Sequence, residues 1–358
     1  MNSKLIARRV RAIRRELNKK KIRFLIVTKP ANVTYLTGFL GEDSWAAIAK
    51  GRVYLLTDSR YIEQAQKECP SCKIIDRAGL MAGAVARLVE KLKSVRTVAV
   101  EGSVSTADFD QLKKTVKARF RTVAGIIENV RSVKDESEIA TIRTAAAIST
   151  KALAQTLPYI KPGVTESELA GMLDFQIRKL GARNSFETIV AFGPNGSRPH
   201  HQPGSRKLRK KDAVLIDFGA KYKGYCSDIT RCFVIGGMTS FYKKVYDVVE
   251  QAQAAAIKTI RAGVKITQVD AAARDVIDKA DLPVYGHGTG HGFGLEIHES
   301  PFLKPDCQGK LKAGQVITIE PGIYMPGKLG IRIEDDILVT ETGCKILTRK
   351  CPHSPLLP

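Results

Sequence analysis

The most restrictive feature of this chain is a set of charged residues placed inside strand-like apolar runs of its second half. Burying carboxylates together is unfavourable, because each loses its hydration and like charges repel one another. Divalent cations relieve both effects, so the set predicts a hydrolytic centre that holds two metal ions. The five residues are Asp217 in LIDFGA, Asp228 in CSDITR, His291 in GTGHGFGLEIHE, Glu320 in TIEPGIY and Glu334 in IRIEDD.

A first hairpin is predicted around Asp217 and Asp228. Each aspartate lies five residues from the Tyr222-Lys223 pair, between the apolar runs AVLIDFGA and YCSDITRCFVI. A two-residue turn at this pair would place the aspartates directly opposite each other on one face, with Cβ atoms roughly 5 Å apart. A pair of cations about 3.5 to 4 Å apart, bridged by one carboxylate, would turn their repulsion into ligation.

A second hairpin repeats this plan. Glu320 and Glu334 are placed symmetrically about Gly327, between the runs VITIEPGIY and GIRIEDDILVT. Pro326-Gly327 is the turn signal between them. This longer hairpin is expected to present two more carboxylates to the same site.

Histidines are rare and grouped. Of the six in the chain, five lie in two short stretches, NGSRPHHQPG and YGHGTGHGFGLEIHES. The glycines of the second stretch indicate a site where the backbone passes close to a ligand. These five are His200, His201, His287, His291 and His298.

The strings IDFGA, SDITR, GHGFGLEIHE, TIEPGIY and RIEDD, in this order and at these separations, resemble those of the creatinase and aminopeptidase P family of metallopeptidases. The Xaa-Pro aminopeptidase and prolidase branch is the most similar. NVTYLTGF at 32–39 and TDSRYIEQA at 57–65 resemble the N-terminal domain of that family. The resemblance implies an α/β (α+β) protein with a creatinase-like mixed-sheet domain over residues 1–129. A pita-bread catalytic domain would follow over residues 130–358.

The resemblance also implies how the metal ions are held. Asp217 would chelate one ion, while Asp228 and Glu334 would bridge the two. His291 and Glu320 would complete the shell of the other ion, and Glu320 would accept the proton of the attacking water. Because oxygen donors outnumber the single imidazole and no thiolate is present, we expect Mn2+, with Co2+ and Zn2+ as alternatives.

The same resemblance places His200, His287 and His298 in the substrate pocket, with His201 as a neighbour of the functional His200. Arg332 would orient a bridging carboxylate or contact the substrate. The expected substrates are peptides with proline in the second position. A Xaa-Pro nitrogen carries no hydrogen, so the leaving nitrogen must be protonated, and histidine suits that task.

Other functions remain open at this point. A prolidase, restricted to Xaa-Pro dipeptides, is the main alternative, although Phe302 in HESPFLK occupies a position where some prolidase-like relatives have arginine. That departure favours longer substrates. A non-catalytic binding module of the same fold is a more distant alternative, because such modules are expected to lose ligands. A methionine aminopeptidase is disfavoured by the N-terminal NVTYLTGF string.

The net charge of +22 is unevenly distributed. Residues 1–130 carry 26 Lys and Arg against 12 Asp and Glu, which gives +14, and the rest carry 32 against 24, which gives +8. We interpret the excess as a solvated face and expect no nucleic-acid partner, because no nucleic-acid motif accompanies it. The first 24 residues predict a basic amphipathic helix with Leu5, Ile6, Val10, Ile13 and Leu17 on one side.

No run approaches the roughly 20 apolar residues of a membrane helix, so no membrane association is expected. The seven scattered cysteines, with a single CxxC at Cys69 and Cys72, indicate reduced thiols and a cytoplasmic protein. The family resemblance suggests a homodimer. Helices are also predicted over 61–67, 82–93, 239–261 and 266–278, and helix starts at Asp135 and at the Thr165-x-x-Glu168 capping box.

Overall fold

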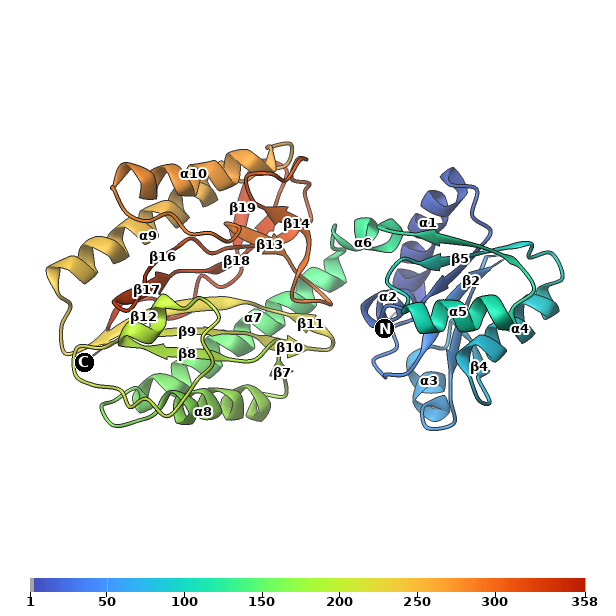
Figure 1. Ribbon diagram of the computed structural model, residues 1–358, viewed down its shortest axis with the longest axis horizontal. Coiled ribbons are helices and arrows are strands. Elements are labelled where there is room, and N and C mark those ends of the chain that lie inside the picture. Colours follow the sequence, from blue (N-terminus) through green and yellow to red (C-terminus); the bar gives the residue numbers. More distant parts are fainter. Residues whose placement is uncertain (1–2, 50, 358) are drawn as a thin grey trace. The chain divides into compact units, whose positions relative to one another are not determined.

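The computed structural model describes residues 3–49 and 51–357 (Figure 1). The chain divides into two compact units, Met1–Arg131 and Ser132–Pro358. No helix among the described residues is both long and apolar enough to cross a membrane.

The N-terminal unit is built on a six-stranded sheet in the order β4-β3-β2-β1-β5-β6. β2 pairs antiparallel with β1 and β3, whereas the β1–β5, β5–β6 and β3–β4 pairs are parallel. The mixed sheet that the sequence predicts is therefore confirmed. The strands are β1 (Phe24–Val27), β2 (Trp45–Ala49), β3 (Arg52–Thr57), β4 (Lys73–Asp76), β5 (Thr97–Glu101) and β6 (Arg119–Val123).

Both faces of this sheet are covered. All four residues of β1, FLIV, are buried, as expected for a central strand with helices on both sides. On α1 the predicted residues Ile6, Val10, Ile13 and Leu17 are buried, so the basic helix is part of the fold. The helices are α1 (Ser3–Lys19), α2 (Pro30–Thr37), α3 (Ile62–Glu68), α4 (Met81–Leu92), α5 (Thr106–Thr115) and α6 (Ile126–Arg131).

The C-terminal unit contains two helix-covered sheets. In the first, two helices pack on a four-stranded sheet of order β20-β12-β9-β8 through one apolar cluster (Figure 1). The helices are α7 (Glu136–Thr156) and α8 (Glu166–Lys179), and the strands are β8 (Ile189–Phe192), β9 (Ala213–Phe218), β12 (Ile229–Ile235) and β20 (Leu356–Leu357). A smaller sheet, β11-β10-β7, comprises β7 (Arg183–Asn184), β10 (Ala220–Tyr222) and β11 (Tyr225–Cys226).

The second sheet repeats the arrangement. Its five strands, in the order β14-β13-β15-β18-β19, are covered by α9 (Ser240–Thr259) and α10 (Ile266–Lys279), which share a second apolar cluster with them. The strands are β13 (Gly290–Gly292), β14 (Glu299–Leu303), β15 (Val316–Ile319), β18 (Asp335–Val339) and β19 (Cys344–Ile346). The hairpin β16 (Gly322–Met325) and β17 (Leu329–Arg332), and the 3-10 turns η1 (Leu157–Tyr159) and η2 (Gly193–Ser197), complete the unit.

Helix starts in this unit follow the predicted caps. Asp135 begins α7 with a capping box that includes Glu138. Thr165 begins α8 in the same way, and the Glu168 carboxylate accepts a hydrogen bond from the backbone N–H of Thr165. In each case side-chain oxygens satisfy backbone N–H groups that the first helical turn leaves free.

The register of the first hairpin differs from the predicted one. The two-residue turn is Lys223-Gly224, with φ of 47° and 86°, and it closes on the pair Tyr222 and Tyr225. Asp217 therefore pairs with Thr230, and the prediction that it faces Asp228 directly is wrong. The reason is turn chemistry, because a turn with two positive φ angles selects glycine for its second position. Asp228 still lies on the same face, diagonally across from Asp217.

The register of the second hairpin is as predicted. Gly327, with φ of 69°, is the centre of the turn, and Gly322 pairs with Arg332. The same register continues outward, where Ile319 pairs with Asp335. Glu320 and Glu334 consequently lie opposite each other where the hairpin joins β15 and β18.

Candidate metal centre

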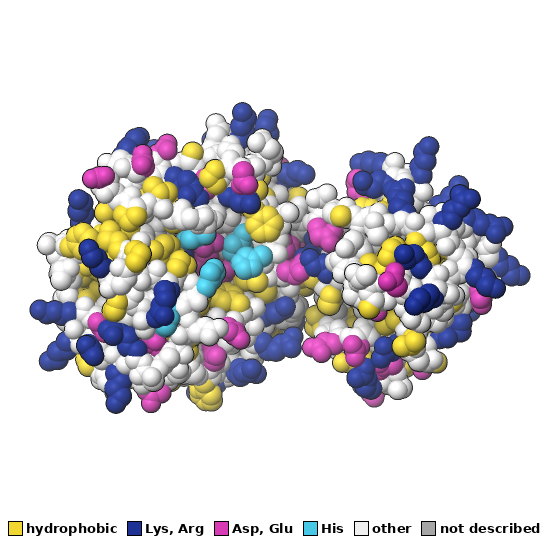
Figure 2. Space-filling model, viewed as in Figure 1, with side chains coloured by type: hydrophobic (Ala, Val, Ile, Leu, Met, Phe, Trp, Pro, Cys, Tyr) yellow, Lys and Arg dark blue, Asp and Glu magenta, His cyan; other side chains and the backbone are white. Residues whose placement is uncertain are grey.

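A cavity of about 480 Å³ in the C-terminal unit contains all the site residues proposed from the sequence. Figure 2 shows histidine side chains grouped around a hollow on this unit, with acidic side chains beside them. Residues from both helix-covered sheets line this cavity, so side chains more than a hundred positions apart in the sequence meet here. The nine residues are His200, Asp217, Asp228, His287, His291, His298, Glu320, Arg332 and Glu334.

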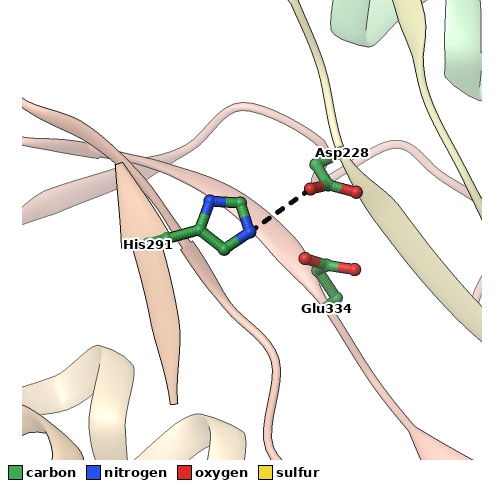
Figure 3. A group of neighbouring side chains, drawn as sticks. All are labelled: Asp228, His291 and Glu334. Carbon is green, nitrogen blue, oxygen red and sulfur yellow. Dashed lines mark ion pairs between the residues drawn. The ribbon is translucent and has the colours of Figure 1, made fainter. Parts of the chain in front are cut away.

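Three of these side chains form a compact group of donors. Ligand atoms of Asp228, His291 and Glu334 all lie within 4.8 Å of one another, and all three residues are buried (Figure 3). His291 Nε2 is 3.6 Å from Asp228 Oδ2 and 3.3 Å from Glu320 Oε1. Glu320 thus joins the group from the side of His291.

The backbone of β13 fixes how His291 is presented. A Cβ at Gly290 would lie 2.0 Å from the carbonyl oxygen of Thr318, and one at Gly292 would lie 2.4 Å from that of Ser300. Neighbouring strands therefore leave no room for a side chain at these two glycines, and the close approach of a ligand to this backbone remains a prediction. His291 Nδ1 donates to the carbonyl of Gly292 at 3.1 Å, which leaves the Nε2 lone pair facing the acids.

Asp217 has one oxygen engaged and one free. Its Oδ2 accepts a hydrogen bond from Nη2 of Arg332 at 2.5 Å. Its Oδ1 is buried without a hydrogen-bond partner among the described residues. A buried carboxylate oxygen without a partner is costly unless a cation binds there.

Two threonines hold the glutamates. Thr230 donates to Glu334 Oε2 at 2.5 Å and itself accepts a hydrogen bond from Arg332 Nε at 3.0 Å. Thr318 donates to Glu320 Oε1 at 3.1 Å. Each glutamate is therefore oriented by a hydrogen bond from a threonine hydroxyl, as metal-binding carboxylates generally are by neighbouring groups.

The electrostatics of this cavity favour a cation. Burial, together with the charges of Glu334, Asp217 and Glu320, raises the pKa of Asp228 well above its usual range. Burial and then the charges of Glu320 and Asp217 do the same to the pKa of Glu334, and burial raises the pKa of Glu320. Burial also lowers the pKa of His291, so its ring is neutral and available as a ligand.

A layer of buried charges behind the centre was missed by the sequence analysis. Asp336 accepts a hydrogen bond from the backbone N–H of Asp228, and Arg231 donates to Asp335 at 2.7 Å and to the carbonyl of Glu334 at 2.6 Å. Thr230, which supports Glu334, lies two residues after Asp228 and so on the same face of the strand. Strand alternation could therefore have predicted its place at the site. Nothing local marks Asp336 and Arg231, because their partners are distant in sequence.

His287 belongs to a chain of hydrogen bonds that reaches Arg332. Its Nδ1 donates to the carbonyl of Gly288 at 2.8 Å, so Nε2 accepts from the hydroxyl of Tyr324 at 3.0 Å. Arg332 Nη1 in turn donates to that hydroxyl at 2.7 Å. Burial lowers the pKa of His287. Tyr324 was not among the residues proposed from the sequence.

The two neighbouring histidines differ in their surroundings. His201 is buried, and its Nε2 lies 2.8 Å from Glu166 Oε2. His200 is exposed at the wall of the cavity, which His298 also lines. The ring of His298 lies 4.4 Å from that of His291. The prediction that His200 is the functional member remains a prediction, and this geometry supports it.

The residues present fit a divalent-metal site. The donors are carboxylate oxygens and one neutral imidazole, and the partnerless oxygen of Asp217 points to a missing positive charge. Carboxylate and imidazole donors suit Mn2+, Co2+ and Zn2+. The candidate ligands are Asp217, Asp228, His291, Glu320 and Glu334.

Comparison with known proteins identifies the family. The sequence of residues 140–341 matches metallopeptidase family M24, and that of residues 9–133 matches the creatinase/prolidase N-terminal domain. The chain belongs to metallopeptidase family M24. Its C-terminal unit has the pita-bread fold, which confirms the predicted fold class, and the M24 chain is a metallopeptidase.

Relatives cover nearly the whole of this M24 chain. An uncharacterized peptidase of Bacillus subtilis is 37% identical over 334 residues, which are 92% of this chain and 94% of the relative. The Xaa-Pro dipeptidase from Bacillus anthracis is 36% identical, with a TM-score of 0.94 over 98% of this chain and 100% of its own. The X-Pro aminopeptidase from Thermotoga maritima is 34% identical, with a TM-score of 0.90 over 97% and 99%.

Proposed function

We propose that this M24 peptidase removes the N-terminal residue from peptides whose second residue is proline, and that it does so with two divalent metal ions. One observation carries the proposal. Four carboxylates and the free Nε2 of His291 converge in a cavity that also contains His200, His287 and His298. Solved relatives named for Xaa-Pro substrates support the substrate class.

The ions would be held by Asp217, Asp228, His291, Glu320 and Glu334, and Mn2+ is the proposed metal. When bound, such ions polarise a scissile carbonyl and activate water near neutral pH. The protein contributes the geometry: Arg332 orients Asp217, and Thr230 orients Glu334. Each carboxylate is thereby held in one direction before a substrate arrives.

Glu320 is the proposed proton acceptor. It is half-buried at the wall of the cavity, with Oε1 3.3 Å from His291 Nε2, where a carboxylate can act as a general base. Thr318 occupies Oε1 as a donor, which leaves Oε2 to hold a proton.

The histidines solve the problem posed by a proline nitrogen. That nitrogen has no hydrogen for an enzyme to recognise, and it must be protonated as the bond breaks. His298 and His200 lie at the open side of the cavity, where a proton is exchanged readily with water. His287, held neutral by burial, has its one N–H engaged by the carbonyl of Gly288 and its Nε2 by the hydroxyl of Tyr324, so its proposed role is to line the substrate pocket.

The test is metal analysis combined with hydrolysis of a peptide panel. Chelator-treated protein should lose activity on Ala-Pro-Ala and regain it with Mn2+, with two ions bound per chain. Ala-Ala-Ala serves as the control substrate for proline selectivity, and Met-Ala-Ser tests the methionine aminopeptidase alternative. Full activity after removal of the metal, or equal rates on all three peptides, would contradict the proposal.

Prolidase activity is a second candidate, favoured by Lys304. A dipeptidase needs a cation for the free carboxylate of its substrate, and Phe302 does not supply one. Lys304 directly follows β14, lines the same cavity and has a side chain 46% exposed, with its Nζ 3.6 Å from Asp306 Oδ2. Phe302 and Lys304 both line this cavity, so Lys304 offers a positive charge in the same part of the chain.

Comparison of Ala-Pro with Ala-Pro-Ala separates the two candidates. Cleavage of the dipeptide alone would replace the aminopeptidase proposal by prolidase. In that case Lys304→Met should raise KM for Ala-Pro, because the variant would lose the cation proposed to bind the free carboxylate of the dipeptide.

We also propose a cytoplasmic homodimer. All seven cysteines are free thiols in the structure, in keeping with a reducing compartment. Light scattering of the purified chain and fractionation of the source cells test these two assignments separately.

A further inference from the structure

The N-terminal unit has a cavity almost as large as the peptidase cavity. Its volume is about 470 Å³, within the range of small-molecule sites. It lies where α1 ends and where β1 and β5 begin, and every described residue that lines it belongs to this unit. The metal centre contributes nothing to it.

The wall of this cavity is strongly basic. Its cationic residues come from four separate segments, and no described residue that lines it is Asp or Glu. Among the ion pairs of the described residues, none involves any of these cations. Within the described part of the chain these cations therefore have no acidic partner. The cations are Arg14, Lys21, Arg23, Arg96 and Arg121.

Two of the guanidinium groups are positioned by the backbone. Arg14 lies against Gly51, where an added Cβ would be 3.1 Å from both Nη atoms, so the glycine leaves room for this side chain. Arg121 Nη1 donates to the carbonyl of Lys20 at 3.3 Å. All five cations are exposed, and these contacts hold two of them at the wall of the cavity.

The floor of the cavity is apolar. Leu17 and Ile22, from the end of α1 and the segment after it, are buried yet line the cavity, and Val95 is half-buried beside them. A ligand that fits this site therefore combines an anionic part with a planar or apolar part.

We propose that this cavity binds an organic phosphate of nucleotide size. Guanidinium groups match phosphate oxygens through two parallel hydrogen bonds, and four of the five cations are arginines. A triphosphate, with its several negative charges, offsets most of the positive charge of this wall, whereas a single carboxylate does not. The base would rest on Leu17, Ile22 and Val95. The site is independent of the peptidase proposal, since it shares no residue with the metal centre.

The experiment is calorimetric titration of the full-length, metal-loaded protein with ATP, tripolyphosphate, adenosine and an eight-nucleotide RNA. The test variant is Arg23→Glu/Arg96→Glu, because no hydrogen bond or ion pair of either side chain exists among the described residues. The matched control is Lys114→Glu/Lys117→Glu. Its two exposed lysines lie in the same unit outside the cavity, and its net charge changes equally.

ATP should bind the wild type and the control alike, and its affinity should fall at least about tenfold in the test variant. Affinity should also weaken between about 50 and about 200 mM KCl, as charge-dominated binding does. Tripolyphosphate should bind more weakly than ATP, and adenosine more weakly still. Peptidase activity of the test variant should equal that of the wild type.

Three outcomes would overturn the proposal. Equal ATP affinity in the wild type and the test variant would place the nucleotide elsewhere, the metal centre included. Tripolyphosphate binding as tightly as ATP would remove the role of the apolar floor. RNA binding more tightly than ATP would make the cavity part of a nucleic-acid surface.

Discussion

Arg332 donates from Nη2 to Oδ2 of Asp217, and the other oxygen of that carboxylate is left buried without a partner among the described residues. The guanidinium thereby sets the direction in which Asp217 presents its free oxygen to the centre. Arg332 reaches Thr230 and Tyr324 through its other nitrogens. One side chain therefore connects a candidate ligand, the support of Glu334 and the hydroxyl beside His287.

Replacing Arg332 by lysine should lower kcat by about 10- to 100-fold, because an ammonium group cannot make these divergent contacts at once. The amount of metal bound per chain should fall less than kcat. Steady-state kinetics and metal analysis measure the two effects. Arg209→Lys, at an exposed position, is the control and should be neutral. Wild-type kcat in Arg332→Lys would remove the orienting role.

Asp228→Asn should abolish turnover while the protein still folds, because a candidate bridging ligand is lost and the apolar clusters are untouched. Activity should be below about a tenth of the wild-type kcat at saturating Mn2+. The exposed Asp275→Asn on α10 is the matched control. A variant that keeps more activity than this would show that Asp228 does not bridge the ions.

Metal binding should stabilise the protein more at high pH than at low pH. In the metal-free protein the raised pKa values of Asp228, Glu320 and Glu334 make the folded state bind more protons than the unfolded state. Stability of that form therefore falls as pH rises above the ordinary carboxyl range. Bound ions compensate the deprotonated carboxylates. The gain in melting temperature with Mn2+ should grow between about pH 5 and pH 8. A gain that shrinks over this range would contradict the assignment.

Substitution of His200 should affect activity, whereas substitution of the neighbouring His201 should affect stability. His201→Ala leaves the buried Glu166 without one of its partners and should lower the melting temperature. His200→Ala, at the exposed wall of the cavity, should leave the melting temperature unchanged and lower kcat/KM. The reverse pattern would make His201 the functional histidine.

Gly290→Ala should strongly destabilise the C-terminal unit, because the new Cβ would lie 2.0 Å from the carbonyl oxygen of Thr318. Gly171→Ala is the matched control on α8, where nothing lies within 4 Å. A helical glycine replaced by alanine typically gains about 0.5 to 1 kcal/mol. Chemical denaturation measures both, and equal effects would refute the close-contact argument for Gly290.

The parts of the fold that follow from local chemistry could be predicted from the sequence. Asp135 and Thr165 mark helix starts because their side chains bond to the first free N–H groups. The turn at Gly327 fixes the register of Glu320 and Glu334, because the pattern of apolar residues is symmetric about it. These features depend on residues only a few positions apart.

The first hairpin shows where such reasoning fails. Tyr222-Lys223 is central by counting, yet Lys223-Gly224 is the turn, because glycine supplies the positive φ that the turn requires. Likewise NVTYLTGF was noted only as a motif, whereas Pro30 begins α2 and Gly38 ends it in a left-handed conformation. At the first hairpin the conformational preference of one glycine outweighed symmetry, and at α2 the preferences of Pro30 and Gly38 set the helix ends.

The support of the candidate site could not be predicted, because it is made of contacts across long sequence separations. Asp336 binds the backbone of Asp228, and Arg231 binds the carbonyl of Glu334. A single acid in a strand has the same local appearance whether it is buried or exposed. Only the approach of the two sheets distinguishes these cases.

Thr230 and Glu334 also form an isolated backbone bridge between the two helix-covered sheets, beside side chains that both sheets direct at the proposed ions. Metal ions bound at this point would hold the two helix-covered sheets of the C-terminal unit together. Amide protons of β12 and β18 should then exchange with solvent more slowly, and as one cooperative group, once the ions are bound.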